Sequence, residues 1–503
     1  MKRSTPVIVG VGQYTLREPR PGFPEDPAAL AIEAVRRAFA DAGIAESHTE
    51  RVEAFHTINM LSWRYRPDAA HEICTRLGIS PRICVETSVG GEQPVAVIDD
   101  LSDQIARGEL DFAVVSGAEG QYSLSSAKRS GTPVPWPVKP AQSSRPADHV
   151  KAIVHPEAWR HGLRFPIQVY PLFENAYRAA KHQTFAAAQA ESGALWAEMS
   201  SVAAQNPHAW YREPLSAEQI VTPGPTNRWI FYPYPKHLNA APNVNQSAAV
   251  VLMSSSLADE FAIPESHRVH PISAARGREI ADPIRRPSFS RSRAMEATLD
   301  HALRTATQAG ELPELLEIYS CFPVVPKLAR DHLGLPAHRE LTVTGGLSFF
   351  GGPGNNYMLH GVADLVARLR QSPEPSTALA YGQGEFVTKH AALVLSSAAP
   401  ATEYQAGTEP IAEQRAIDAA VVNDVESAPD GPSVIETFTA FQEGDGWIGL
   451  VVGRLEADGR RFVARTDPTD TRTMAGLLSP DLEAVGRPGT VTPGERFNEF
   501  VLR

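Results

Sequence analysis

The sequence predicts an α/β protein made of two copies of one unit, followed by a small antiparallel β-barrel. Three observations predict this architecture. Short, β-branched apolar runs alternate with helical patterns through residues 5–396, which is typical of stacked strand–helix units. Landmark residues of the first half recur about 260 residues later, as internal duplication requires. Short strands joined by glycine–aspartate turns fill residues 433–503, and such a run indicates a barrel.

The first copy opens with a short, largely apolar strand at 5–13, as expected of a buried strand. A helix begins at Asp26-Pro27, because aspartate is a good N-cap and proline suits the first helical position, and it ends at Gly43. The remaining elements are a strand at 52–60, a helix ending at Leu77-Gly78, a strand at 82–88, a helix to Arg107 and a strand at 112–120.

The second copy repeats this order. Its elements are a strand at 270–280, a helix at 291–309, a strand at 315–322, a helix ending at Leu333-Gly334, a strand at 340–346, a helix at 357–369 and a strand at 377–385. Matching landmarks are Leu77-Gly78 with Leu333-Gly334, Thr87 with Thr344, and Gly117 with Gly382. Their nearly constant separation favours duplication. The alternative is that unrelated strand–turn–helix units simply resemble one another.

An insertion at 121–240 separates the copies. It starts with a Pro/Ser-rich loop and continues with helices. Loops that follow strand C-termini usually build the site of an α/β protein, so we expect the insertion to cover the site. The predicted domains are a first half (1–265, with the insertion), a second half (266–398), a linker (399–432) and the barrel (433–503).

Composition restricts the functional class. The chain has 503 residues, is 43% hydrophobic and 21% charged, and carries a net charge of -11. An acidic globular chain is a poor binder of nucleic acid or of anionic membranes. No apolar run reaches the length of a membrane span, and the N-terminus lacks the apolar core of a signal peptide. Only three cysteines occur, without metal-ligand or redox spacing, so we expect a cytoplasmic protein without a bound metal.

Ser88 is the most informative single position. A short strand, a Gly-Gly turn and a helix surround it, an arrangement that directs a side chain at a helix N-terminus, where an anion is favoured. A cysteine there would have a lowered pKa and act as a nucleophile, whereas a serine hydroxyl is far harder to ionise. Two roles stay open for Ser88: contact with an acyl group, or N-cap of the following helix.

The duplicated unit, the turn at Ser88 and the glycine run at 342–356 together resemble the thiolase superfamily. The segment PYPKHLNAAPNVNQSAAVVLMSS at 233–255 and the run FENAYRAAKH within the insertion resemble sterol-carrier-type thiolases. The resemblance implies a duplicated five-layer α/β/α/β/α thiolase fold. The motif GGPGNNY with a β-rich C-terminal extension resembles the thiolase-like proteins called type 1. These are classed by family as acetyl-CoA acetyltransferases of lipid metabolism, and they carry an extra C-terminal barrel.

The resemblance also assigns four chemical positions, and this chain departs from the family at all of them. Ser88 replaces the nucleophilic cysteine, and Tyr319 stands where the family has the Asn or His oxyanion donor. Gly352 replaces the histidine of the G-H-P motif, and Ala380 stands at the second cysteine. Thiolysis needs a thiolate, a base and an oxyanion donor. Ordinary thiolase activity is therefore not expected.

Several other residues are candidates for ligand contact. Backbone N–H groups of the glycine turns either hold a thioester or pantetheine amide, or simply form tight turns. The residues concerned are Gly90, Gly91, Gly351, Gly354, Asn355 and Asn356. His360 either points back to the site or lies in the core. His390 is expected to be structural, and Cys84 and Cys321 are either substitute thiols or small buried residues. The pairs Arg285-Arg286 and Arg460-Arg461 either touch a CoA phosphate or lie on a solvated face.

Two functions follow. The first is an acyltransferase-like protein that binds a coenzyme A thioester, an acyl-CoA, and needs no other cofactor. The alternative is a non-catalytic binding or assembly subunit, a pseudoenzyme, whose barrel contacts a protein partner. Classical thiolases pair through an edge strand beside the nucleophile. An added barrel would block that pairing, which favours a monomer, with a dimer as the alternative.

Overall fold

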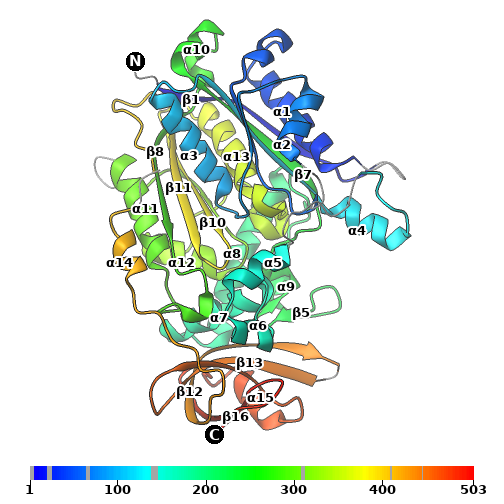
Figure 1. The fold of residues 1–503 in the computed structure, drawn as a ribbon, viewed down its shortest axis with the longest axis vertical. Coiled ribbons are helices and arrows are strands. Elements are labelled where there is room, and N and C mark those ends of the chain that lie inside the picture. Colours follow the sequence, from blue (N-terminus) through cyan, green and yellow to red (C-terminus); the bar gives the residue numbers. More distant parts are fainter. Residues whose placement is uncertain are drawn as a thin grey trace.

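Two sheets with the same strand order lie at the centre of the larger part of the molecule (Figure 1). The computed structural model describes residues 5–19, 25–63, 68–136, 146–306, 312–407, 411–444 and 446–503. The first sheet has the order β1-β7-β4-β2-β3 and the second the order β8-β11-β10-β9. Their strands are β1 (Pro6–Thr15), β2 (Ala54–Thr57), β3 (Ile83–Glu86), β4 (Phe112–Gly120), β7 (Asn245–Ser254), β8 (His270–Arg278), β9 (Leu315–Ile318), β10 (Thr377–Gly384) and β11 (Lys389–Ser396).

The strand directions confirm the duplication. In the first sheet β7 runs antiparallel to β1 and β4, and β2 runs parallel to β4. In the second sheet β11 runs antiparallel to β8 and β10, and β9 runs parallel to β10. The four strands β1, β7, β4 and β2 therefore correspond in order and direction to β8, β11, β10 and β9.

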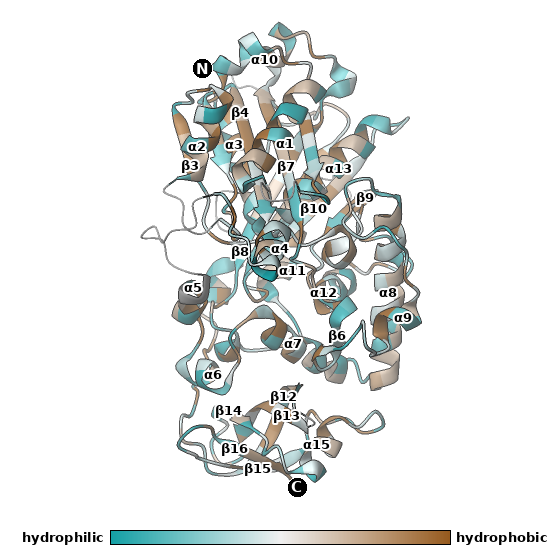
Figure 2. Ribbon diagram, turned by 90° about the vertical axis from the view of Figure 1, so that its right-hand side faces the viewer, coloured by the Kyte–Doolittle hydropathy of each residue, from teal (hydrophilic) through white to brown (hydrophobic). Residues whose placement is uncertain are grey.

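The two sheets form two layers of a five-layer stack, and helices form the other three layers. The helices α3 (Gln93–Ala106) and α13 (Tyr357–Gln371) contact strands of both sheets and form the middle layer. On the outside, α1 (Pro27–Asp41) and α2 (Ala69–Leu77) pack on the first sheet, and α11 (Arg293–Ala306) packs on the second. The last predicted residues of α11 lie outside the described residues. Figure 2 shows the hydrophobic colouring of β4 inside this stack.

The helix boundaries follow from the predicted signals. Asp26 is the N-cap of α1, and its Oδ1 accepts a hydrogen bond from the N–H of Ala29 at 2.6 Å, with Pro27 as the first helical residue. Gly78 ends α2 with a φ of 73°, a left-handed conformation that favours glycine. These local signals were sufficient because capping depends on neighbours in the sequence.

The strand predicted at 340–346 is not formed. The buried carboxylate of Glu317 accepts hydrogen bonds from the N–H groups of Val343 and Thr344 at 2.8 and 3.0 Å. Those N–H groups are therefore taken by a side chain instead of a neighbouring strand. The chain turns here and continues into a short π-helical segment, Gly346–Phe350.

The insertion forms a helical layer between the sheets and the C-terminal domain. Its elements are α4 (Gln121–Ser130), α5 (Pro146–Ile153), α6 (Pro156–His161), α7 (Pro166–Ala180), α8 (Phe185–Gln205), α9 (Ala217–Val221), β5 (Trp229–Phe231) and β6 (Tyr234–Pro235). Residues 137–145 of the predicted Pro/Ser-rich loop lie outside the described residues. Shorter helices elsewhere are α10 (Ser255–Glu260), α12 (Val324–His332) and α14 (Gln414–Asp418). No helix within the described ranges is long and apolar enough to cross a membrane.

The C-terminal strands close into a five-stranded barrel with the order β12-β13-β14-β16-β15, as predicted. They are β12 (Gly431–Glu443), β13 (Gly446–Leu455), β14 (Arg461–Arg465), β15 (Pro488–Thr492) and β16 (Glu499–Leu502), and α15 (Thr471–Leu477) lies between β14 and β15 in the chain. The pairing of β14 with β16 is parallel, and the other pairings are antiparallel. The barrel has its own apolar core, which includes Phe438, Phe462 and Phe500.

The barrel is attached to the insertion by hydrogen bonds along β12. Tyr232 N–H donates to the carbonyl of Ala440, Asn175 Nδ2 donates to the carbonyl of Phe438, and Thr439 Oγ1 donates to the carbonyl of Tyr232, each at 2.8 Å. In Figure 1 the barrel accordingly lies against α6 and α7, at the opposite end of the molecule from the N-terminus. The insertion therefore serves as the platform for the barrel.

Candidate functional site

The predicted turn after β3 is formed, but Ser88 is not at the start of the helix. The N-cap of α3 is Glu92, and the first helical residue is Gln93. Ser88 lies in the irregular segment between β3 and α3 and is exposed. Ser88 therefore does not cap α3, and the residue placed at the helix N-terminus is a glutamate.

The two histidines considered for this site are engaged elsewhere. His360 is wholly buried, and its Nδ1 donates to Gln13 Oε1 on β1 at 2.7 Å. His390 hydrogen-bonds through Nδ1 to the Tyr381 hydroxyl at 2.7 Å, and burial lowers its pKa to about 3. Within the described ranges, no histidine is hydrogen-bonded to Ser88. Among the described residues, its hydroxyl therefore has no hydrogen-bonded histidine to activate it as a nucleophile.

Glu92 is the buried acid of the site. Its side chain packs between two glycines, because a Cβ atom on Gly90 or Gly384 would overlap Glu92 Oε2. Oε1 accepts a hydrogen bond from Gln93 Nε2 at 2.8 Å, while Oε2 is buried without a partner among the described residues. Burial raises the pKa of Glu92, and the nearby charge of Lys389 opposes that rise. The carboxyl group therefore retains its proton above the usual range.

Three titratable side chains, Glu385, Lys389 and His149, contact one another near Glu92, at the turn between β10 and β11. Glu385 Oε1 lies 2.7 Å from Lys389 Nζ and 3.0 Å from His149 Nε2. Lys389 Nζ also donates to the carbonyl of Val89 at 3.2 Å. Basic side chains from the insertion and from β11 therefore meet at the turn that precedes α3.

Tyr319 lies at the same place, as its predicted role requires. A Cβ atom on Gly91 would be 2.6 Å from the Tyr319 hydroxyl, so this oxygen lies directly over Gly91. Burial raises the pKa of Tyr319 far above its usual value, and the hydroxyl stays protonated as a hydrogen-bond donor. The structure thus brings together Gly90, Gly91, Glu92 and Tyr319, which we call the α3 elbow.

Ala380 is not part of the α3 elbow. It lies within β10, is wholly buried and pairs with Leu393 of β11. Further along the strand, Gly382 approaches the elbow, since a Cβ atom there would lie 3.0 Å from Glu92 Cα. The side of β10 that faces the elbow is therefore lined by Gly382 and Gly384.

The glycine run at 351–356 uses its polar groups to join the two halves. The N–H of Gly352 donates to the carbonyl of Ala241 at 2.9 Å, and the N–H of Gly354 donates to the carbonyl of Gly352 at 2.7 Å. Asn355 Oδ1 accepts from the N–H of Gly90 at 3.0 Å, and Asn356 Nδ2 donates to the carbonyl of Gly117 at 2.8 Å. Gly351 is also buried. These groups, which were expected to bind a ligand, are engaged within the protein.

The candidate thiols are poor nucleophiles in this fold. Cys321 is buried, and its sulfur accepts a hydrogen bond from Gln383 Nε2 at 3.4 Å. Burial raises the pKa of Cys321 to about 12. Cys84 lies 3.7 Å from Cys74, sulfur to sulfur, and burial raises the pKa of both. Neither Cys84 nor Cys321 supplies a thiolate near neutral pH.

Alkylation tests this directly. We expect iodoacetamide at pH 8 to modify Cys321 at least about a hundredfold more slowly in the folded protein than in urea, because burial suppresses the thiolate. Mass spectrometry of the Cys321 peptide over time measures the two rates. Similar rates in both conditions would contradict the buried, protonated state.

Two of the arginines considered for a CoA phosphate or a solvated face, Arg286 and Arg461, are buried instead. Arg286 donates to the carbonyls of Phe386 and Val387 at 2.6 and 3.0 Å. Arg461 is wholly buried and bonds to Glu436 of the barrel. Neither guanidinium group is therefore available for a CoA phosphate.

The sequence did not reveal Glu92, Glu385, Lys389 and His149 as site residues. Glu92 stands just before an apolar helix, which is the ordinary position of an acid that complements the helix dipole. Its burial depends on Gly384, which is remote in the sequence. His149 and Glu385 likewise meet only through the fold. The only local signal was the acid at a helix start beside two glycines.

Comparisons with known proteins agree with this architecture. Residues 413–496 match the family model for the thiolase-like protein type 1 additional C-terminal domain. No curated protein matches the chain. The chain is similar to the crystal structure of a monomeric SCP2-thiolase like protein type 1 from Mycobacterium smegmatis, with 29% identity over 100% of both chains and a TM-score of 0.84.

Two further structures share the fold. The Ltp2-ChsH2(DUF35) aldolase is 18% identical over 78% of this chain and 97% of that chain, with a TM-score of 0.57. An acetyl-CoA acetyltransferase from Syntrophomonas wolfei is 14% identical over 79% of this chain and 100% of that chain, with a TM-score of 0.55. The resemblance noted in the sequence is confirmed. The closed barrel of this chain lies in the region that matches the additional C-terminal domain of thiolase-like protein type 1. The chain is a thiolase-fold protein similar to thiolase-like protein type 1.

Proposed function

We propose that the chain binds a coenzyme A thioester at the α3 elbow and does not carry out ordinary thiolysis. The observation that carries this proposal is the set of side chains at the start of α3, which differs from the thiolate and base that thiolysis needs. A buried carboxyl group, Glu92, and a buried phenol, Tyr319, lie there, and the exposed Ser88 has no histidine hydrogen-bonded to it in the described part of the chain. A phenol and a carboxyl group with a raised pKa can serve as hydrogen-bonding groups, but they do not replace a thiolate.

Each residue has a distinct part in this proposal. The Tyr319 hydroxyl over Gly91 and the Glu92 carboxyl, whose pKa is raised by burial, are placed to contact a thioester carbonyl oxygen. Lys389 and His149, which both contact Glu385, supply polar N–H donors beside the elbow. Ser88 orients the ligand at most, since its hydroxyl is not activated. We therefore do not expect the acyltransferase reaction of the family at this site.

Turnover and binding are measured separately. With acetoacetyl-CoA and CoA we expect no loss of the enolate absorbance, while calorimetry with acetyl-CoA shows binding. Glu92→Leu should weaken binding about tenfold, because a hydrogen bond to a buried polar group is lost, whereas Glu92→Gln retains a donor and should bind within about twofold. Thermal melting confirms that each variant is folded.

The controls separate the two parts of the proposal. Ser88→Ala should leave binding unchanged. Turnover that disappears in Ser88→Ala would overturn the absence of thiolysis, and no binding heat with wild-type protein would overturn the ligand. Equal binding by Glu92→Leu and wild type would remove Glu92 from the site.

We also propose a cytoplasmic monomer. The Mycobacterium smegmatis relative is described as monomeric, and both chains are covered over their whole length. Light scattering should give the mass of one chain.

The alternative function, contact with a partner through the barrel, has one observation in its favour: Leu482 and Val501 of the barrel are exposed apolar residues. Single exposed apolar residues are common, so this remains the second candidate.

A further inference from the structure

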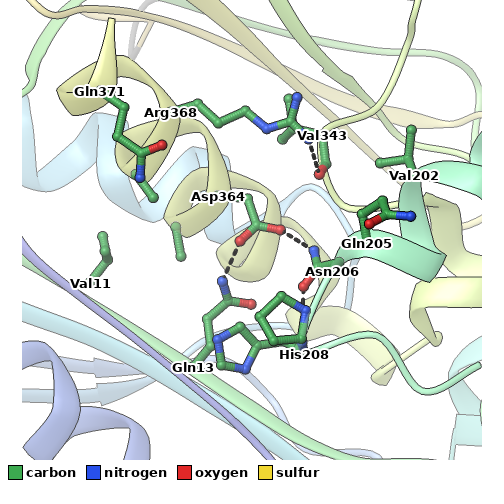
Figure 3. Close-up of a pocket in the computed structure, with 13 residues that line it drawn as sticks. Val11, Gln13, Val202, Gln205, Asn206, His208, Val343, Asp364, Arg368 and Gln371 are labelled. Carbon is green, nitrogen blue, oxygen red and sulfur yellow. Dashed lines mark hydrogen bonds between the residues drawn. The ribbon is translucent and has the colours of Figure 1, made fainter. Parts of the chain in front are cut away.

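A cavity lies between β1, the end of α8 and α13, and it shares no residue with the α3 elbow (Figure 3). Its volume is about 390 Å³, within the range of small-molecule sites. We infer that this cavity binds a zwitterion of the α-amino acid class, with the ammonium group at Asp364 and the carboxylate at Arg368. This inference does not rest on the function proposed above.

Asp364 is held in place by residues from two other elements. Its Oδ1 accepts a hydrogen bond from Gln13 Nε2 on β1, and its Oδ2 accepts one from Asn206 Nδ2 after α8, both at 2.6 Å. Gln13 Oε1 is itself bonded to His360 Nδ1 at 2.7 Å. Figure 3 shows these amides converging on the carboxyl group at the cavity wall. A carboxylate fixed in this way is preorganised for a cation, which lowers the cost of binding.

Arg368 supplies the opposite charge one helical turn later. Residues four apart on a helix usually pair when their charges are opposite, yet no ion pair joins Asp364 and Arg368 in the described part of the chain. Arg368 Nη2 donates instead to the carbonyl of Val343 at 3.1 Å. Each carboxylate oxygen keeps a lone pair, and the guanidinium group keeps further N–H donors. A ligand that carries both charges can pair with both residues. A simple amine would pair with Asp364 but would meet the like charge of Arg368. A simple carboxylic acid would pair with Arg368 but would meet the like charge of Asp364.

The rest of the cavity suits a side chain of mixed character. Val11, Val202 and Val343 provide apolar surface, and Gln205 and Gln371 provide amides. His208 also lines the cavity, and burial lowers its pKa to about 4, so it is neutral near pH 7. Above pH 7, the only charged side chains among the lining residues are therefore those of Asp364 and Arg368.

The ionisation of Asp364 makes binding depend on pH. Burial raises the pKa of Asp364 to about 7. The hydrogen bonds from Gln13 and Asn206 and the charge of Arg368 lower it, and the charge of Glu317 on β9 raises it. His360 and His208, the other titratable groups nearby, both have lowered pKa values. An ammonium group needs the ionised carboxylate, so affinity should fall about tenfold from pH 8 to pH 6.

Calorimetry at pH 8 with L-leucine, L-glutamine and L-phenylalanine tests the inference. At least one is expected to bind with a Kd below about 1 mM. For leucine, the matched probes are 3-methylbutylamine, which lacks the carboxylate, and 4-methylpentanoate, which lacks the amine. Each such analogue of a binding amino acid should bind at least about tenfold more weakly, because one charge of the site is left unpaired.

Variants locate the site. Asp364→Asn and Arg368→Gln should each weaken binding at least about tenfold, while Glu374→Gln, a change at an exposed residue beyond α13, should not. Arg368 is itself exposed, so its variant stays informative even if Asp364→Asn fails to fold. Failure of all three amino acids to bind at 10 mM, equal binding by the analogues, or unchanged binding in Arg368→Gln would each overturn the inference.

Discussion

Replacing Lys327 by methionine is expected to lower the free energy of unfolding by about 3–5 kcal/mol, because it leaves a buried carboxylate without its cation. Lys327 Nζ lies 2.6 Å from Glu174 Oε1 and 2.7 Å from Ser192 Oγ, and Lys327 and Glu174 are both buried. This pair joins α12 of the second half to α7 of the insertion. Urea denaturation followed by circular dichroism measures the loss.

An exposed pair between the same two helices is the matched control. Lys181 Nζ lies 2.6 Å from Asp331 Oδ2, with about half of the lysine side chain exposed. Lys181→Met should cost less than about 1 kcal/mol, since exposed pairs contribute little. The double variant Lys327→Met/Glu174→Gln should recover part of the loss because no unpaired charge remains. Equal losses for Lys327→Met and Lys181→Met would contradict this account.

Arg461→Met is expected to loosen the barrel and to cost about 3 kcal/mol or more. The Arg461 side chain is wholly buried, its Nε lies 2.7 Å from Glu436 Oε2, and its Nη1 donates to the carbonyls of Ile284 and Arg286 at 2.6 and 2.7 Å. One guanidinium group thus connects β12 and β14 of the barrel with the second half. Limited proteolysis of the linker at 399–432 should accelerate, and the melting temperature should fall.

Its neighbour in the sequence provides the control. Arg460 is about half exposed and pairs with Asp458 and Glu426 at the surface. Arg460→Met should change the free energy of unfolding by less than about 1 kcal/mol and leave the rate of proteolysis unchanged. If Arg461→Met behaves like Arg460→Met, the barrel is not held by this buried contact.

The sequence predicted the fold wherever local signals decide the structure. Caps such as Asp26 and Gly78, the alternating strands and the hairpin turns depend on neighbours in the chain, and the corresponding elements are present. The strand at 340–346 was predicted wrongly because Glu317, from another strand, takes its backbone N–H groups. No local pattern reveals a carboxylate that arrives from elsewhere in the fold.

The site was predictable only in part, for the same reason. Tyr319 and the Gly90-Gly91 turn do meet, as the resemblance to thiolases implied. Glu92 was missed because its burial depends on a distant turn, and Arg461 looks like any surface arginine in sequence. The glycine run had the composition of a ligand loop, yet Asn355 and Asn356 bond to the other half of the protein. Composition alone does not distinguish these two uses.

Glu92 packs between Gly90 and the remote Gly384, so the side chains that fit at these three positions depend on one another. A side chain larger than hydrogen at Gly90 or Gly384 would overlap the Glu92 carboxyl group, so a substitution of either glycine must displace that buried group. Conversely, a small residue at position 92 would leave a void bounded by backbone. Across related sequences we therefore expect these three positions to covary. Their joint variation would distinguish chains that keep a buried acid at the α3 elbow from chains that have other side chains there.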